Sequence, residues 1–109
     1  MKTRNKVELI GYLGSDPKVV AMSHGKSKVT LRLATDFYYR DDKTNLHRET
    51  TWHEITVWDK LAETVIGNFI KGSHVLVEGR IEYRSFTDIK GRIHHNAQVR
   101  ATTLINLDR

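Results

Sequence analysis

Apolar and polar side chains alternate along much of this chain, which is typical of strands with one buried face. Between Lys28 and Phe37, Val29, Leu31 and Leu33 share one face, and the residues between them point to the other. Similar runs, bounded by turn residues, predict five substantial strands: Lys6–Leu13, Lys28–Phe37, Thr50–Trp58, Ser73–Phe86 and His94–Asn106.

Two further strand features follow from the same pattern. In the strand that begins at Ser73, Val75, Val77 and Ile81 are expected to face inward. A short edge strand is expected at Val19–Met22, before a turn at Ser23–Lys26.

One segment has helical spacing instead of alternation. Its apolar residues recur every three or four positions, at Leu61, Ala62, Val65, Ile66, Phe69 and Ile70. Asp59 is expected to cap the start of this helix, and Lys71 with Gly72 to end it. The polar segment Tyr38–Glu49 is expected as a long exposed hairpin loop, and Asp88–Arg92 as a turn. This order of elements predicts an all-β fold, an OB-fold Greek-key barrel of five strands with one short helix between the third and fourth strands.

Length and composition narrow the class of protein. The 109 residues are expected to form a single domain over residues 1–109, with Lys and Arg numbering 18 against 13 Asp and Glu, for a net charge of +5. That excess favours a polyanionic partner. The absence of Cys excludes disulfides and thiolate zinc sites. With neither a membrane-length apolar run nor a signal peptide, we expect a cytoplasmic protein without a membrane partner.

The segment around the two tryptophans carries the functional signal. Trp52 and Trp58 lie on the face of their strand opposite Ile55 and Val57, which join the core. Large aromatic side chains placed away from the core, in a basic chain, suit stacking on unpaired bases. The alternative is that the tryptophans cap the barrel or fill a subunit interface. We favour the first interpretation, which predicts a binder of single-stranded nucleic acid.

Several motifs resemble one known family, the bacterial single-stranded DNA-binding proteins (SSB). Asn5–Pro17 is similar to the opening of these proteins. The similarity continues through Leu33–Thr35, Thr51–His53, Lys60–Glu63, Lys71–Ser73, Val77–Ile81 and Phe86–Asp88. The resemblance implies an OB-fold that assembles as a homotetramer, with a dimer as the alternative, and that wraps unpaired DNA without enzymatic activity or a cofactor. It also implies roles in replication, recombination and repair, and association with the nucleoid.

The resemblance also implies individual site residues. The stacking aromatics correspond to Tyr39, Trp52, Trp58 and Phe86, and the cationic groove is expected to use Lys6, Arg40, Lys43, Lys60 and Arg84. The segments 38–49 and 84–92 are expected to close over the DNA as mobile arms. Val7, Leu9 and His53 are expected at a subunit interface, where protonation of His53 would loosen the assembly at low pH.

Other functions find less support in the sequence. None of the six histidines has metal-ligand spacing, so no metal is expected. An OB-fold nuclease would need a cluster of carboxylates for a metal, and an oligosaccharide-binding barrel would not need the positive charge. A primosome-type accessory protein would share the barrel but carry fewer stacking aromatics. The family's linker and acidic tip do not follow Asp108 and Arg109, so replication and repair partners recruited by that tip are not expected.

Overall fold

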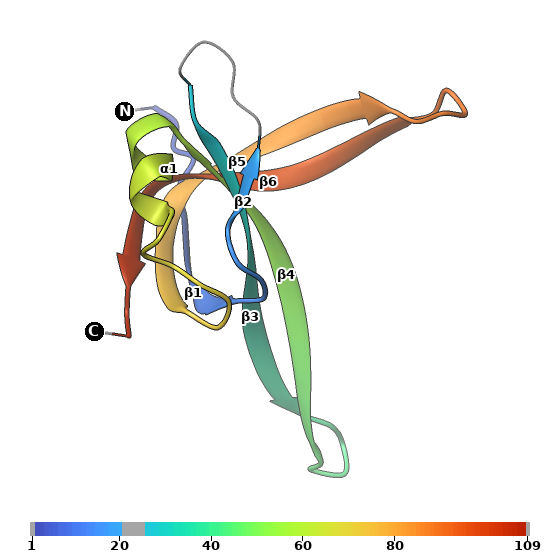
Figure 1. Cartoon of the computed structure of the whole chain (residues 1–109). Helices are drawn as coiled ribbons and strands as arrows, with labels where there is room; N and C mark the ends of the chain where they lie inside the picture. Colours follow the sequence, from blue (N-terminus) through green and yellow to red (C-terminus); the bar gives the residue numbers. More distant parts are fainter. Residues whose placement is uncertain (1, 21–25, 109) are drawn as a thin grey trace.

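The computed structural model describes residues 2–20 and 26–108, and over these residues the chain forms a β-barrel with one helix (Figure 1). The elements in chain order are β1 (Val7–Leu13), β2 (Lys18–Val20), β3 (Lys28–Arg40), β4 (Leu46–Trp58), α1 (Asp59–Val65), β5 (His74–Thr87) and β6 (Ile93–Asn106). The expected edge strand is therefore present as β2. Met22 and most of the turn predicted after it lie outside the described residues.

Pairing of β1 at both edges closes the barrel. The strand order β1-β5-β6-β4-β3 returns to its start because Tyr12 and Leu13 of β1 pair with Ala34 and Leu33 of β3. β4 and β6 run parallel where they meet, and β2 extends the sheet outward from β3. The predicted five-stranded OB-fold barrel is confirmed, with α1 between the third and fourth of its strands, β4 and β5.

The core follows the predicted alternation. Its members from the barrel strands include Leu13, Val29, Leu31, Leu33, Ile55, Val57, Val75 and Val77, to which α1 adds Ala62 and Val65. Ile81 is the exception to the predicted inward faces, because it is 36% exposed at the point where β5 leaves the barrel. Alternation thus predicts which way a side chain points, but not where along the strand the core ends.

The helix is shorter than its sequence pattern predicts. It ends at Val65, and Ile66 already has an extended backbone, followed by Gly67 with φ +86°. Phe69 is buried, but from the irregular segment after the helix and not from a third helical turn. The predicted cap is also wrong, since Trp58 holds the N-cap position. Asp59 is the first helical residue, with φ 55°, and its N–H donates to the Ser27 carbonyl at 2.7 Å.

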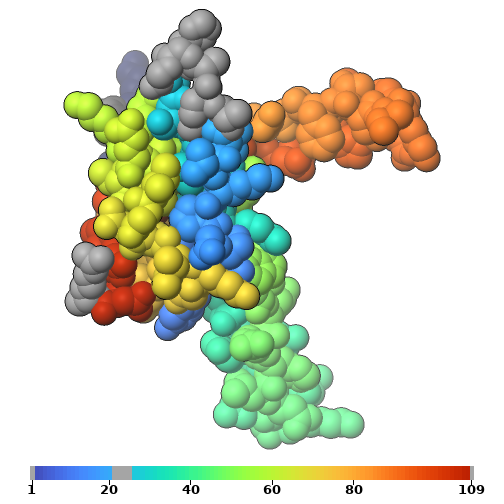
Figure 2. Space-filling model, in the orientation of Figure 1, coloured from blue at the N-terminus to red at the C-terminus, as the bar shows by residue number. Residues whose placement is uncertain are grey.

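Two hairpins project beyond the barrel as arms (Figures 1 and 2). β3 and β4 stay paired as far as Arg40 and Leu46, so the loop predicted at 38–49 is wrong, and the turn spans only residues 41–45. β5 and β6 stay paired as far as Thr87 and Ile93. We call residues 36–50 the β3–β4 arm and residues 83–97 the β5–β6 arm. Side chains are exposed on both faces of an arm, which removes the alternation of polarity by which sequence reasoning detects strands.

Candidate nucleic-acid interface

Trp52 and Trp58 lie on one face of β4, opposite the buried Ile55 and Val57, as predicted. Trp52 is 49% exposed and Trp58 is half-buried. Thr56 lies between them and is fully buried, so the face is not open along its whole length. The two indole rings are accessible on either side of Thr56.

Basic side chains from neighbouring strands cover both indole rings. The Arg32 guanidinium lies 4.9 Å from the centroid of the Trp52 ring. At Trp58, the Lys28 ammonium and the Arg100 guanidinium lie 5.0 Å and 5.2 Å from the centroid. Sequence reasoning missed all three cations, because their positions depend on cross-strand register. Lys28, for example, pairs directly with Trp58. A cation on an indole is itself stabilised and can pair with phosphate at the same time.

Open hollows join both tryptophans to the base of the β5–β6 arm. Beside Trp52 the hollow is lined by Ile81, Ala97 and Gln98. Beside Trp58 another is lined by Arg84, Gln98 and Arg100. The structure therefore brings the predicted Arg84 together with Trp58. Gln98 lines both hollows and was not predicted.

Tyr39 and Phe86 lie on separate arms. Their side chains are 44% and 45% exposed, and each ring is stacked on a histidine of the opposite strand. Tyr39 and His47 have ring centroids 5.2 Å apart, and Phe86 and His94 have centroids 5.0 Å apart. The four predicted stacking residues are thus one pair on the barrel and one residue on each arm.

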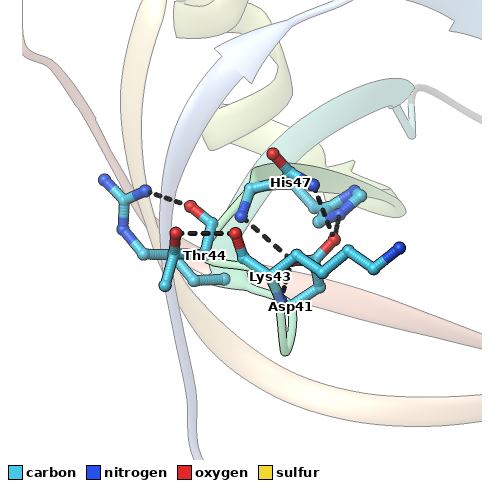
Figure 3. Close-up of polar contacts among 6 residues, drawn as sticks. Asp41, Lys43, Thr44 and His47 are labelled. Atoms are coloured by element: carbon cyan, nitrogen blue, oxygen red, sulfur yellow. Dashed lines mark hydrogen bonds and ion pairs between the residues drawn. The ribbon is translucent and has the colours of Figure 1, made fainter.

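The predicted basic residues are dispersed. Lys6 forms an ion pair of 3.6 Å with Glu78, in a hollow also lined by Arg4 and Arg80. Lys60 is exposed at the start of α1. Arg40 and Lys43 belong to the β3–β4 tip, where the Arg40 guanidinium donates to the Thr44 carbonyl (Figure 3). Of the five predicted cations, Arg84 shares a hollow with Trp58.

The predicted interface residues are partly buried within this subunit. Val7 and Leu9 are partly buried and pack against the core, whereas Ile10 and Tyr12 of the same strand are 51% and 55% exposed. His53 is half-buried, with its Nε2 hydrogen-bonded to the Thr35 hydroxyl at 2.8 Å. Burial lowers the pKa of His53 below its usual value, because the charged imidazolium is poorly solvated there.

Two further observations concern metal binding and membrane insertion. Within residues 2–20 and 26–108, no three His, Asp or Glu side chains gather as a metal site would require. In the same part of the chain, no helix has the length and apolarity to cross a bilayer.

Comparison with known proteins connects this geometry to a family. The profile of the single-strand binding protein family matches residues 4–107. The chain is 43% identical over 86 residues to single-stranded DNA-binding protein 1 of Chlorobaculum tepidum, a match that covers 79% of this chain and 53% of that protein. It is 37% identical over 103 residues to single-stranded DNA-binding protein 1 of Xylella fastidiosa, covering 93% and 75%. The chain therefore spans about half the length of the Chlorobaculum relative.

Solved structures agree with the sequence comparisons. The Plasmodium falciparum SSB in complex with ssDNA superposes with a TM-score of 0.89 at 28% identity, covering 99% of this chain and 98% of that one. A deletion mutant of the Thermus aquaticus single-stranded DNA binding protein superposes with a TM-score of 0.82 at 28% identity, covering 95% and 50%. By its sequence and its fold, the chain belongs to the single-strand binding protein family.

Proposed function

We propose that this chain binds single-stranded DNA without base-sequence preference and without catalysing a reaction. The observation that carries the proposal is the pair of accessible tryptophans on one face of β4, each with a cation over its ring. Every base has a π face, so stacking tolerates any sequence, and the cations can follow the phosphates. Duplex DNA is disfavoured because its bases are already stacked. The names of the relatives support this choice of ligand.

Each arm adds one aromatic residue to this site. Tyr39 and Phe86 are exposed beyond the barrel, and we place DNA bases on them when the arms close along a bound strand. Arg84 lines the Trp58 hollow and lies two positions before Phe86 on β5, so it can contact a phosphate between the barrel and the β5–β6 arm. Neutralised phosphates release counterions, so affinity should fall as salt rises.

Self-association would multiply this surface. We propose a homotetramer that uses the outer side of β1, where Ile10 pairs across strands with Leu76 and Leu76 with Ile105. Ile10 and Ile105 are 51% and 46% exposed, which makes this cross-strand row an apolar strip on the outside of the barrel. Several linked sites on one DNA molecule raise the avidity of binding. The cellular role that suits such a protein is protection of unpaired DNA in the cytoplasm during replication, recombination and repair.

The first test is quenching of intrinsic tryptophan fluorescence by oligo-dT, at low and high salt, with duplex DNA as the control. We expect saturable quenching by oligo-dT alone. Replacing Trp52 or Trp58 by Ala should weaken binding by about 1–3 kcal/mol for each lost stack. Folded protein that shows no quenching by oligo-dT would contradict the stacking mechanism.

A matched pair of variants tests the β3–β4 arm. Tyr39→Ala should weaken binding of oligo-dT, whereas Tyr38→Ala, on the opposite face of the same strand, should leave it unchanged. Incubation of single-stranded DNA with the protein and Mg²⁺ or Ca²⁺ excludes the nuclease alternative if the DNA stays intact.

A further inference from the structure

Both arms end in the same arrangement of an aromatic residue, an aspartate and a histidine. The aspartate begins the turn, the aromatic residue lies two positions before it, and the histidine lies six positions after it. We call these sets the tip triads: Tyr39, Asp41 and His47 in the β3–β4 arm, and Phe86, Asp88 and His94 in the β5–β6 arm.

The two triads have nearly the same geometry. In the β3–β4 arm, His47 Nε2 lies 2.8 Å from Asp41 Oδ2 (Figure 3). The imidazole is inclined by 17° to the Tyr39 ring. In the β5–β6 arm, His94 Nε2 lies 2.7 Å from its carboxylate oxygen and is inclined by 17° to its aromatic partner. An ionised carboxylate only accepts hydrogen bonds, so Nε2 carries the hydrogen in both triads.

The turn itself accounts for the aspartate but not for the histidine. Asp41 Oδ1 accepts hydrogen bonds from the Lys43 and Asn45 N–H groups, and Asp88 Oδ1 accepts the equivalent pair at the other tip. These bonds close each turn without the imidazole. Apart from the shared aspartate and a lysine two positions later, the turns differ in sequence, with Thr44 where the other has Gly91. The repeated histidine therefore needs another explanation.

Protonation of the histidine would change the charge of the tip. The hydrogen bond from His47 is the main reason why the pKa of Asp41 is lowered, and the bond from His94 does the same for the pKa of Asp88. The carboxylates thus remain ionised at neutral pH. Uptake of a proton by the imidazole adds one positive charge to the tip.

The other charged groups near the triads do not prevent this change. His47 shares its face of β4 with Glu49, and Lys43 lies in the adjoining turn. At the other tip, the Arg92 guanidinium lies 3.9 Å from Asp88, and Arg84 shares its face of β5 with Phe86. In both arms, therefore, a protonated imidazole would lie beside a carboxylate, a neighbouring cation and the exposed aromatic ring.

We propose that His47 and His94 are additional DNA-contacting residues, which make binding by the arms tighten as the pH falls. This inference rests on the proposed binding of single-stranded DNA. A protonated imidazole beside Tyr39 or Phe86 can stack on a base and pair with a phosphate. The aspartate holds the ring in the orientation that extends the aromatic surface, so it acts as a positioning residue.

The test measures the affinity of the full chain for a fluorescently labelled oligo-dT from pH 8 to pH 5.5 at constant ionic strength. Thymine does not titrate in this range, so the protein supplies any proton uptake. We expect binding to tighten on the order of fivefold, which two added positive charges facing phosphates can supply. The double variant His47→Gln/His94→Gln should lose most of this change.

A matched control lies on the same arm. His95 follows His94 but points to the opposite face, where its Nδ1 lies 2.8 Å from the Ser85 hydroxyl. His95→Gln should keep the pH dependence in full. The parent, the double variant and His95→Gln all retain His53. If the double variant keeps the same pH dependence as the parent, the proposal is overturned. If the parent binds oligo-dT at no pH, the proposed function itself fails, which is a distinguishable result.

A second readout follows from linkage. Ligand that binds the protonated form more tightly must raise the pKa of the groups involved. Histidine resonances followed by NMR should therefore show upward pKa shifts of His47 and His94 when oligo-dT is added, and an unchanged pKa for His95. Unshifted resonances of both tip histidines in a saturated complex would contradict the proposal.

Discussion

At the scale of single residues, Gly14 controls where the Trp52 ring can lie. A Cβ atom at position 14 would lie 2.4 Å from Cζ3 of the indole, closer than any real contact allows. The atom that would have to move belongs to a side chain and not to the backbone, so the ring can shift without disrupting the barrel. The sequence shows this glycine only as part of a turn, because the contact joins segments almost forty positions apart.

We predict that Gly14→Ala displaces the Trp52 ring and weakens binding of oligo-dT by several-fold, while the melting temperature changes little. The emission maximum of tryptophan and a fluorescence titration would measure both effects. Ser15→Ala, at the exposed neighbouring position, is the control and should behave like the parent. Unchanged emission and affinity in the glycine variant would contradict the role given to this contact.

His53 makes the stability of the folded state depend on pH. Its pKa is lowered by burial, so the folded chain binds fewer protons than the unfolded chain below the usual histidine pKa of about 6.5. The contribution of neutral His53 to the stability of the folded state is therefore complete above that pH. It declines as the pH falls from there towards the lowered pKa. We predict that the melting temperature falls between pH 7 and pH 5, and that this fall is smaller in His53→Gln. Parallel curves for the two proteins would contradict this prediction.

At the scale of elements, the two arms are paired strands of similar design with different turn residues. Thr44 has φ 61° and Gly91 has φ 81°, at the same position of their turns. The left-handed region costs about 1–2 kcal/mol for a residue with a Cβ atom, and the Thr side chain is branched at that atom. The β3–β4 tip is therefore strained where the β5–β6 tip is not.

We predict that Thr44→Gly stabilises the β3–β4 tip by about 1 kcal/mol, after allowance for the greater flexibility of glycine in the open state. Amide hydrogen exchange in residues 41–47 should slow by about fivefold. The reverse change at the other arm, Gly91→Thr, should speed exchange in residues 88–94, since a Cβ there meets open space and only the backbone angle is strained. Exchange that does not respond in either arm would disprove this account.

Helix α1 shows how a local pattern can extend past its element. Phe69 continues the helical spacing of Leu61 and Val65 and is buried, yet the helix has already ended. Gly67 turns the chain with φ +86° and returns Phe69 to the same core from a different direction. The helical spacing correctly predicts that these residues are buried, but tertiary contacts determine which of them belong to the helix.

At the scale of the whole molecule, the arms make the chain more extended than its length requires. The radius of gyration is 16.3 Å, whereas a compact domain of this size would have about 13 Å. The difference reflects two hairpins with exposed side chains and little contact with the barrel (Figure 2). Surfaces of this kind are available to follow a flexible polymer such as unpaired DNA.

The proposed assembly depends on the outer strip of β1, β5 and β6. We predict that Ile10→Lys converts the oligomer to smaller species, because a charge in a buried apolar contact is strongly disfavoured. Sedimentation velocity would measure the mass, and circular dichroism would show that the barrel persists. Ile89→Lys, at the exposed β5–β6 tip, is the matched control and should leave the mass unchanged. An oligomer that survives Ile10→Lys would place the interface elsewhere.

The sequence by itself determined the features that depend on neighbours along the chain. Alternation set the buried faces of the barrel strands, and it placed Trp52 and Trp58 opposite Ile55 and Val57. Only the tertiary structure decided the features that depend on register between strands: the cations over the tryptophans, the contact with Gly14, the continued pairing of the arms and the tip triads. The physical reason is that side-chain direction repeats every two residues within a strand, whereas a cross-strand neighbour is chosen by backbone pairing between distant segments.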